Sequence, residues 1–278
     1  MYSKEKKQTK LTFANLNKQK ATGRKFSMVT CYDFSFAKIV ESSAVDMVLV
    51  GDSLANVMMG ESNTLAAKVD HIVHHCKAVS KGLQSKLLIA DMPFLACGVS
   101  REKTIENAGR LMSEGNAHAV KIEGAGDRIS DIKALVDLGI PVVGHLGLMP
   151  QKVHAHGGYR VQGRNDDAAK QILKDALELQ KAGVSILVVE MLQNDVAKSL
   201  TDSLDIPVIG IGAGKHCDGQ VLVLQDLLGM DAEFNPTFLR KYMQLADSVK
   251  TALDTYDSDV KSGEFPNDSE SFARKTKK

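Results

Sequence analysis

Five short apolar runs in this chain each end in an ionisable side chain, and this pattern constrains the fold more than any other feature. The runs cover residues 48–52, 87–91, 119–123, 141–145 and 186–190, and they end in Asp52, Asp91, Glu123, His145 and Glu190. Runs of this length that are rich in β-branched residues are typical of strands buried on both faces. Because parallel α/β barrels carry their active sites where the strands end, the five runs predict one rim of such a barrel.

The wider chain alternates strand and helix patterns. The predicted strands cover residues 28–32, 47–51, 87–90, 119–122, 142–144, 186–189, 208–211 and 221–224. Helical patterns lie between most of them, over residues 34–42, 69–80, 101–114, 129–138 and 166–182, and glycines that favour left-handed helix ends follow three of these, at Gly115, Gly139 and Gly183. Eight such strands predict an α/β fold, a single-domain (β/α)8 TIM barrel, and 278 residues suit that size. An open doubly wound sheet is the alternative, but its G-x-G-x-x-G fingerprint is absent from the first βα turn.

The two ends of the chain are polar. We expect an N-terminal extension over residues 1–25, a barrel catalytic domain over 26–255 and a polar C-terminal tail over 256–278. A terminal helix is predicted within residues 236–254. The tail is predicted to be flexible or to form an arm across a neighbouring subunit.

Composition excludes several classes of partner. The formal net charge of +1 gives no reason to expect a nucleic acid. No apolar run approaches the roughly 20 residues of a membrane helix, and the first ten residues lack the apolar core of a secretory signal. The four cysteines are irregularly spaced and form no CxxC pair, which favours reduced thiols in a cytoplasmic protein over a zinc site.

Three of the terminal acids suggest a metal site. Asp52, Asp91 and Glu123 close the second, third and fourth predicted strands, and neighbouring strands lie about 4.8 Å apart. Three oxygen ligands without a soft donor select a hard divalent cation, most simply Mg²⁺. The alternative is that these acids cap helices or pair with lysines. Three acids on successive strands favour the metal site.

Further ionisable groups suggest what the metal site acts on. Lys121 lies two residues before Glu123 and so shares its face, where a buried ammonium would hold an anionic group of the substrate or form a structural ion pair. Glu190, farther round the rim, suits proton abstraction from a substrate whose carbonyl is polarised by the metal, with an enolate as the product of that step. His145 is expected to donate a hydrogen bond to the substrate or relay a proton, although a histidine satisfied within the core fits almost as well.

Three weaker features are also present. Residues 210–214 follow a G-x-G-x-G pattern that could cradle a phosphate, although close backbone approach to any ligand would explain it equally. His71 and His75 have helical spacing without the acid of an H-E-x-x-H motif, which favours a solvated helix face. His154 and His156 lie in a Gly-rich stretch that we predict to be a loop over the site.

At these positions the chain resembles a known family, ketopantoate hydroxymethyltransferase, also called 3-methyl-2-oxobutanoate hydroxymethyltransferase. The matching stretches, which extend in order from about residue 10 to about residue 270, are residues 32–38, 49–54, 90–94, 120–124, 144–148, 157–164, 209–214 and 217–223. The resemblance implies a Mg²⁺-dependent (β/α)8 barrel that transfers a one-carbon unit from 5,10-methylenetetrahydrofolate to 3-methyl-2-oxobutanoate. The product would be 2-dehydropantoate, in the first committed step of pantothenate synthesis.

The resemblance also implies roles for individual residues. The positions matching Asp52, Asp91 and Glu123 surround the metal, and the one matching Glu190 is the general base. Those matching Asp52, Ser53, Asp91 and Lys121 contact the keto acid. Family members are typically decamers, so a homo-oligomer is expected.

Two other functions stay open at this point. One is a Mg²⁺-dependent enolate lyase or aldolase on the same barrel, but such lyases need a reactive cysteine loop, and no Lys-Lys-Cys-Gly-His-like segment occurs here. The other is a catalytically silent metabolite-binding barrel, which would have no need for the complete set of Asp52, Asp91, Glu123 and Glu190. Dependence on the folate donor would separate all three.

Overall fold

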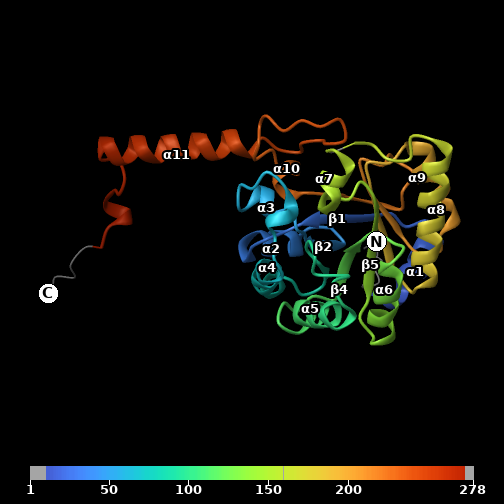
Figure 1. Ribbon diagram of the computed structural model, residues 1–278. Helices are drawn as coiled ribbons and strands as arrows, with labels where there is room; N and C mark the ends of the chain where they lie inside the picture. Colours follow the sequence, from blue (N-terminus) through green and yellow to red (C-terminus); the bar gives the residue numbers. More distant parts are fainter. Residues whose placement is uncertain (1–10, 159, 273–278) are drawn as a thin grey trace, which may run out of the picture. The chain divides into compact units, whose positions relative to one another are not determined.

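A computed structural model describes residues 11–158 and 160–272 of the chain and contains a closed parallel barrel (Figure 1). Its strands are β1 (Phe26–Thr30), β2 (Met47–Val50), β3 (Leu87–Asp91), β4 (Ala119–Glu123), β5 (Val142–Gly147), β6 (Ile186–Glu190), β7 (Val208–Ile211) and β8 (Gly219–Leu222). Each strand pairs in parallel with the next, and β8 closes the barrel on β1. The (β/α)8 barrel predicted from the strand pattern is therefore confirmed.

Helices precede the first strand, connect all but one pair of successive strands and follow the last strand (Figure 1). They are α1 (Leu16–Ala21), α2 (Phe34–Ser42), α3 (Leu54–Val57), α4 (Val69–Gly82), α5 (Arg101–Ser113), α6 (Arg128–Asp137), α7 (Val153–His156), α8 (Asp166–Lys181), α9 (Asn194–Ser203), α10 (Leu224–Leu227) and α11 (Leu245–Ser262). Short 3₁₀ turns are η1 (Phe13–Asn15), η2 (Thr64–Ala66), η3 (Pro150–Lys152) and η4 (Asp268–Glu270). Residues 212–218 join β7 directly to β8, so one crossover of the barrel lacks a helix. No helix in the described parts of the chain is long and apolar enough to span a membrane.

The two strands that close the barrel begin two residues earlier than predicted. Phe26 pairs in register with Gly219, where an added Cβ would lie 2.4 Å from the Phe26 carbonyl oxygen. Only glycine fits this close approach of two backbones, and glycine is depleted in strands, so the sequence pattern does not reveal the start of β8.

The predicted terminal helix over residues 236–254 is wrong in its position. Helix α11 begins at Leu245 and continues to Ser262, through the first seven residues of the predicted polar tail and across its expected boundary at residue 256. Ion pairs at i, i+4 spacing, such as Lys261 with Asp257 at 2.7 Å, support a helix that is polar in composition. The helix ends at Gly263, whose φ of 78° is left-handed.

The glycines expected at left-handed helix ends have mixed outcomes. Gly139 and Gly183 have φ values of 82° and 95°, as predicted. Gly115 does not, because the left-handed residue after α5 is Asn116, at φ 57°. Asparagine tolerates this conformation better than most residues, so the left-handed residue can lie one position after the predicted Gly115.

The N-terminal end of the barrel is sealed by the segment before β1. Leu11 and Leu16 are buried in one cluster with barrel-interior side chains such as Met47 and Ile209. Burial of these apolar side chains stabilises that end of the barrel.

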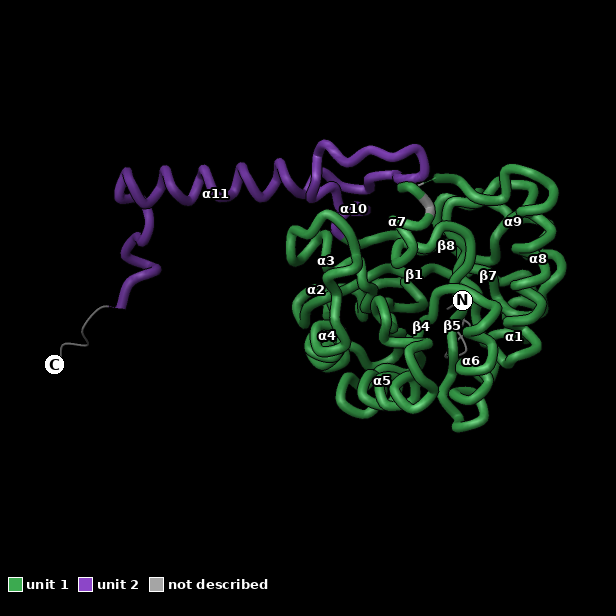
Figure 2. Tube along the Cα trace, in the orientation of Figure 1, with its two compact units in different colours: residues 1–224 green, residues 225–278 purple. Residues whose placement is uncertain are grey.

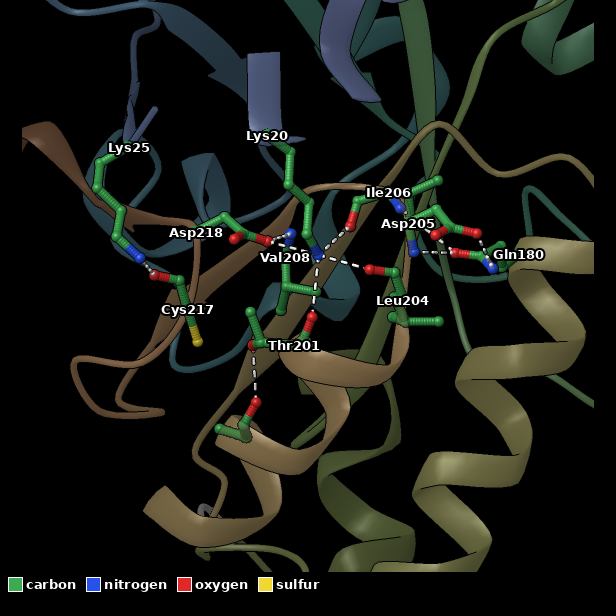
Figure 3. A network of polar contacts seen from close by, with 11 residues as sticks. Lys20, Lys25, Gln180, Thr201, Leu204, Asp205, Ile206, Val208, Cys217 and Asp218 are labelled. Carbon is green, nitrogen blue, oxygen red and sulfur yellow. Dashed lines mark hydrogen bonds and ion pairs between the residues drawn. The ribbon is translucent and has the colours of Figure 1, made fainter. Parts of the chain in front are cut away.

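A lysine on the same segment ties it to the barrel by polar contacts (Figure 3). The Lys20 ammonium donates to the carbonyl oxygens of Thr201, Leu204 and Ile206 at 2.7–3.0 Å and pairs with the Asp218 carboxylate at 3.0 Å. Helix α1 is thereby held to the end of α9 and to the loop before β8.

The chain divides into two compact units (Figure 2). The first ends at Leu224 and contains the whole barrel, and the second begins at Gln225 and contains α11. The proposed site lies entirely within the first unit.

Candidate active site

The strands bring the seven predicted site residues to one end of the barrel. Asp52 and Ser53 directly follow β2, Asp91 ends β3, Lys121 and Glu123 lie on β4, His145 lies on β5, and Glu190 ends β6. Asp91 pairs in register with Lys121, and Glu123 pairs with His145, so neighbouring strands present their ionisable groups at the same level. Five of the seven are buried, whereas Ser53 and Glu190 are half-buried and so face the open end of the barrel.

Lys121 is the cation at the centre of the group. Its ammonium pairs with Asp91 Oδ1 at 2.8 Å and lies 3.3 Å from His145 Nδ1. The other oxygen of Asp91 accepts a hydrogen bond from the backbone N–H of Asp52 at 3.1 Å. The ion pair connects β3 with β4 and fixes the orientation of Asp91.

His145 connects the two glutamates. Its Nδ1 lies 3.4 Å from Glu123 Oε1, and its Nε2 lies 3.3 Å from Glu190 Oε2. The imidazole therefore lies between two carboxylates, and this placement fits a histidine satisfied within the core as well as one that donates a hydrogen bond to the substrate or relays a proton.

Burial and neighbouring charges shift the pKa values of the two aspartates upward. For Asp52, burial raises the carboxyl pKa well above its usual range, and the negative charges of Asp91 and Glu123 raise it further. Burial also raises the pKa of Asp91, although the Lys121 charge opposes the shift. The Lys121 ammonium therefore compensates the buried charge of Asp91 only in part.

The charges of Glu123, His145 and Lys121 compensate one another more fully. Burial would raise the pKa of Glu123, but its hydrogen bond to His145 and the charges of His145 and Lys121 lower it below its ordinary value. Burial and the Lys121 charge would lower the pKa of His145, but its contacts with Glu123 and Glu190 raise it to about 9. Burial likewise opposes the charged form of Lys121, yet the surrounding carboxylates raise its pKa. At neutral pH both basic groups are therefore charged.

The donor set suits a divalent cation by its chemistry. Four carboxylates, of Asp52, Asp91, Glu123 and Glu190, face two positive groups, of Lys121 and His145, which leaves an excess of two negative charges when all are ionised. Apart from their ion pairs, the buried Asp91 Oδ1 and Glu123 Oε1 atoms have no hydrogen-bond partner. In their present arrangement the described side chains form no closed set of three metal ligands. Hard oxygen donors with excess negative charge nevertheless fit Mg²⁺ or a similar ion.

One contributing residue was missed in the sequence. Gln151, in η3, which begins three residues after the end of β5, donates from its side-chain nitrogen to Asp52 Oδ2 at 2.9 Å and to the Met92 carbonyl oxygen at 3.0 Å. Its backbone N–H donates to Glu123 Oε2 at 3.2 Å. A glutamine in a short connection after a strand carries no periodic signal, and it lies outside the stretches that match the family, so nothing in the sequence pattern indicated it.

Tyr32 was also not singled out individually. Its hydroxyl lies 2.8 Å from Ser53 Oγ, and its side chain is almost completely buried. Burial raises the pKa of this phenol, so it remains protonated and can donate to Ser53. The Ser53 hydroxyl is thereby positioned beside Asp52.

The weaker predictions lie outside this group. Gly212 and Gly214 have left-handed φ values, and an added Cβ at Gly214 would collide with Asn194, so the backbone conformation at both positions and the packing at Gly214 favour glycine. His75 is not fully solvated, because its Nδ1 contacts the Tyr32 carbonyl oxygen at 2.6 Å. His154 lies in the short helix α7 rather than in an irregular loop, as does the backbone of His156. Residue 159, in the same stretch, lies outside the described residues.

The closed parallel barrel places this protein in the class of (β/α)8 barrels. Its acidic, basic and hydroxyl groups lie at the strand ends, where barrels of this class carry their active sites. Comparison with other sequences is more specific. The pattern of the family "Ketopantoate hydroxymethyltransferase" matches residues 10–268. The chain belongs to this family, whose members are transferases by name.

Proteins named 3-methyl-2-oxobutanoate hydroxymethyltransferase are similar in sequence to this chain along almost its whole length. The chain is 47% identical to 3-methyl-2-oxobutanoate hydroxymethyltransferase of Clostridium beijerinckii over 96% of each chain. It is 46% identical to the protein of the same name from Leptospira interrogans, over 91% of this chain and 96% of the relative. For the one from Syntrophotalea carbinolica the identity is 44%, over 96% of this chain and all of the relative.

Solved structures support the fold. Phosphoenolpyruvate phosphomutase from Streptomyces platensis subsp. rosaceus superposes with a TM-score of 0.60 at 11% identity, covering 91% of this chain and 88% of that one. Phosphonopyruvate hydrolase in complex with oxalate and Mg²⁺ gives 0.59 at 12% identity, covering 93% and 92%. At such low identity, these likenesses show the barrel architecture alone.

Proposed function

We propose that this protein transfers a hydroxymethyl group from 5,10-methylenetetrahydrofolate to 3-methyl-2-oxobutanoate, giving 2-dehydropantoate. The observation that carries the proposal is the family membership over residues 10–268, combined with the complete set of ionisable groups at the strand ends. By the same resemblance the reaction is the first committed step of pantothenate synthesis. The cytoplasm stays the expected location.

The divalent cation, most simply Mg²⁺, would be held by Asp52, Asp91 and Glu123. Burial of all three carboxylates and the excess negative charge around them support this assignment. When bound, the cation would polarise the keto oxygen of the substrate and so lower the energy of the enolate formed at the neighbouring carbon.

The chain's own groups would bind the keto acid around this point. The Lys121 ammonium attracts the substrate carboxylate, and Ser53, oriented by Tyr32, supplies a hydroxyl for hydrogen bonding. His145 lies within 3.4 Å of both glutamates. Its proposed role is to donate a hydrogen bond to the substrate or to relay a proton. Asp52 and Asp91 would contact the keto acid through the cation that they hold.

Glu190 would be the general base. It is half-buried at the end of β6, with its Oε2 atom 3.3 Å from His145 Nε2, and a carboxylate in that position could accept a proton from a bound substrate. The carboxylate takes the proton from C3 of the substrate, and the resulting enolate forms a C–C bond to the methylene carbon of the folate. Before that bond forms, water breaks both bonds from the methylene carbon to the folate nitrogens, which take up its two protons, so that tetrahydrofolate leaves and the carbon keeps the water oxygen at the formaldehyde level. The proton held by Glu190 ends on the alkoxide that the C–C bond formation leaves.

Glu190→Gln is the variant that tests this assignment. The amide cannot accept the proton, so deuterium loss from C3-deuterated substrate should fall by about 100-fold or more, measured by proton NMR. Substrate binding in the presence of Mg²⁺, measured by calorimetry, should be nearly unchanged. Exchange at the wild-type rate would mean that another group is the base.

A further inference from the structure

Gln151 contacts two of the three proposed metal carboxylates, those of Asp52 and Glu123. It lies in η3, which begins three residues after β5 ends. Its side-chain amide nitrogen reaches Asp52 Oδ2 on the far side of β3 and β4, and its backbone N–H reaches Glu123 Oε2. A single residue therefore holds carboxylates from two different strands.

The Gln151 side chain is itself fixed. An amide NH₂ group has two donor hydrogens, and here both are used, one on Asp52 Oδ2 at 2.9 Å and one on the Met92 carbonyl oxygen at 3.0 Å. The Met92 carbonyl belongs to the residue directly after β3, so the end of the barrel sets the position of the amide. A donor anchored in this way restricts the rotation of the Asp52 carboxylate.

Each contact from Gln151 uses one oxygen of a carboxylate. Gln151 engages Oδ2 of Asp52 and Oε2 of Glu123, while Glu123 Oε1 has no hydrogen-bond partner apart from its ion pair with His145. A neutral amide donor orients a carboxylate without adding a positive charge that would repel a cation. Groups that orient metal ligands in this manner typically change metal affinity by about 10- to 100-fold.

We propose that Gln151 is a positioning residue that orients Asp52, and through its backbone Glu123, for binding the divalent cation. This inference rests on the proposed function, since it assumes that these carboxylates hold a cation. The side chain acts on Asp52 alone, because the contact to Glu123 comes from the backbone and survives substitution of the side chain.

The test measures cation affinity without turnover. Mn²⁺ binding to the purified, cation-free protein is followed by electron paramagnetic resonance, with no keto acid or folate present. Gln151→Met keeps the length of the side chain and removes both donors, and it should weaken Mn²⁺ binding by about 10- to 100-fold. Gln151→Asn keeps the amide but is one methylene shorter, so it should weaken binding in the same direction.

A matched control comes from α8. The Gln171 side-chain nitrogen, Nε2, donates to Asp175 Oδ1 at 2.7 Å on the exposed surface. Gln171→Met therefore removes the same type of hydrogen bond, from a glutamine amide to an aspartate, away from the site. It should leave Mn²⁺ affinity within about two-fold of wild type. Gln151→Met in an Asp52→Asn background should add little further loss, because the positioned carboxylate is already gone.

The possible results separate this inference from the function on which it rests. Wild-type affinity in both Gln151 variants would overturn the positioning role while leaving the metal site intact. A lowered thermal midpoint of the cation-free protein with unchanged Mn²⁺ affinity would also overturn it, because that result indicates a purely structural role. If the wild-type protein itself bound no Mn²⁺ or Mg²⁺, both the proposed metal site and this inference would be wrong.

Discussion

At Asp91, each carboxylate oxygen has a different neighbour. One oxygen pairs with the buried Lys121 ammonium at 2.8 Å, and the other accepts the backbone N–H of Asp52. Positions like Asp91 could be predicted from sequence, because the residue that ends a buried strand points to the barrel rim whatever surrounds it. The partners could not, because they depend on the register between strands that are distant in sequence.

Replacing Lys121 tests the ion pair between Lys121 and Asp91. In Lys121→Met the Asp91 carboxylate remains buried without its cation, so the free energy of unfolding should fall by about 3–5 kcal/mol. Urea unfolding of the cation-free protein at pH 7 measures this loss. Adding Asp91→Asn to the same chain should restore part of the stability, since no uncompensated charge is left. A loss below about 1 kcal/mol in the single variant would contradict the ion pair as described.

Among the elements, strands and central helices followed the sequence closely. Helix α2 and strand β7 have the predicted limits, because Asp33 caps α2 through its side chain and β7 is an uninterrupted apolar run. The predictions failed where tertiary contacts override local pattern. Strand β8 starts at a glycine that only backbone packing against Phe26 explains, and α11 is held by surface ion pairs that a hydrophobic pattern does not detect.

The polar contacts of Lys20 are predicted to anchor helix α1 to the barrel. Lys20→Met removes the ammonium from three carbonyl oxygens and from Asp218, which should destabilise the protein by about 2–4 kcal/mol in urea unfolding. Lys25→Met is the control, since the exposed Lys25 donates to a single acceptor, the Cys217 carbonyl oxygen at 2.9 Å. That variant should stay within about 0.5 kcal/mol of wild type. Equal effects of the two substitutions would show that the Lys20 cluster does not anchor α1.

For the whole molecule, the barrel unit contains the complete proposed site, and the second unit has a different character. Helix α11 has no buried residue, and it exposes the apolar side chains of Val249, Leu253, Tyr256 and Val260 at spacings that share one face. The homo-oligomer expected from the family stays a prediction, and this face is where such an assembly could cover apolar surface. The composition of the chain alone does not indicate an oligomer.

The most direct measurement of the central claim is deuterium loss from C3-deuterated 3-methyl-2-oxobutanoate, followed by proton NMR in the wild-type protein. We expect no exchange without a divalent cation, exchange when Mg²⁺ is added, and 2-dehydropantoate only after 5,10-methylenetetrahydrofolate is supplied. Exchange without product would keep the cation and base but contradict the proposed transfer. An absence of exchange with Mg²⁺ present would contradict the proposed chemistry of the site.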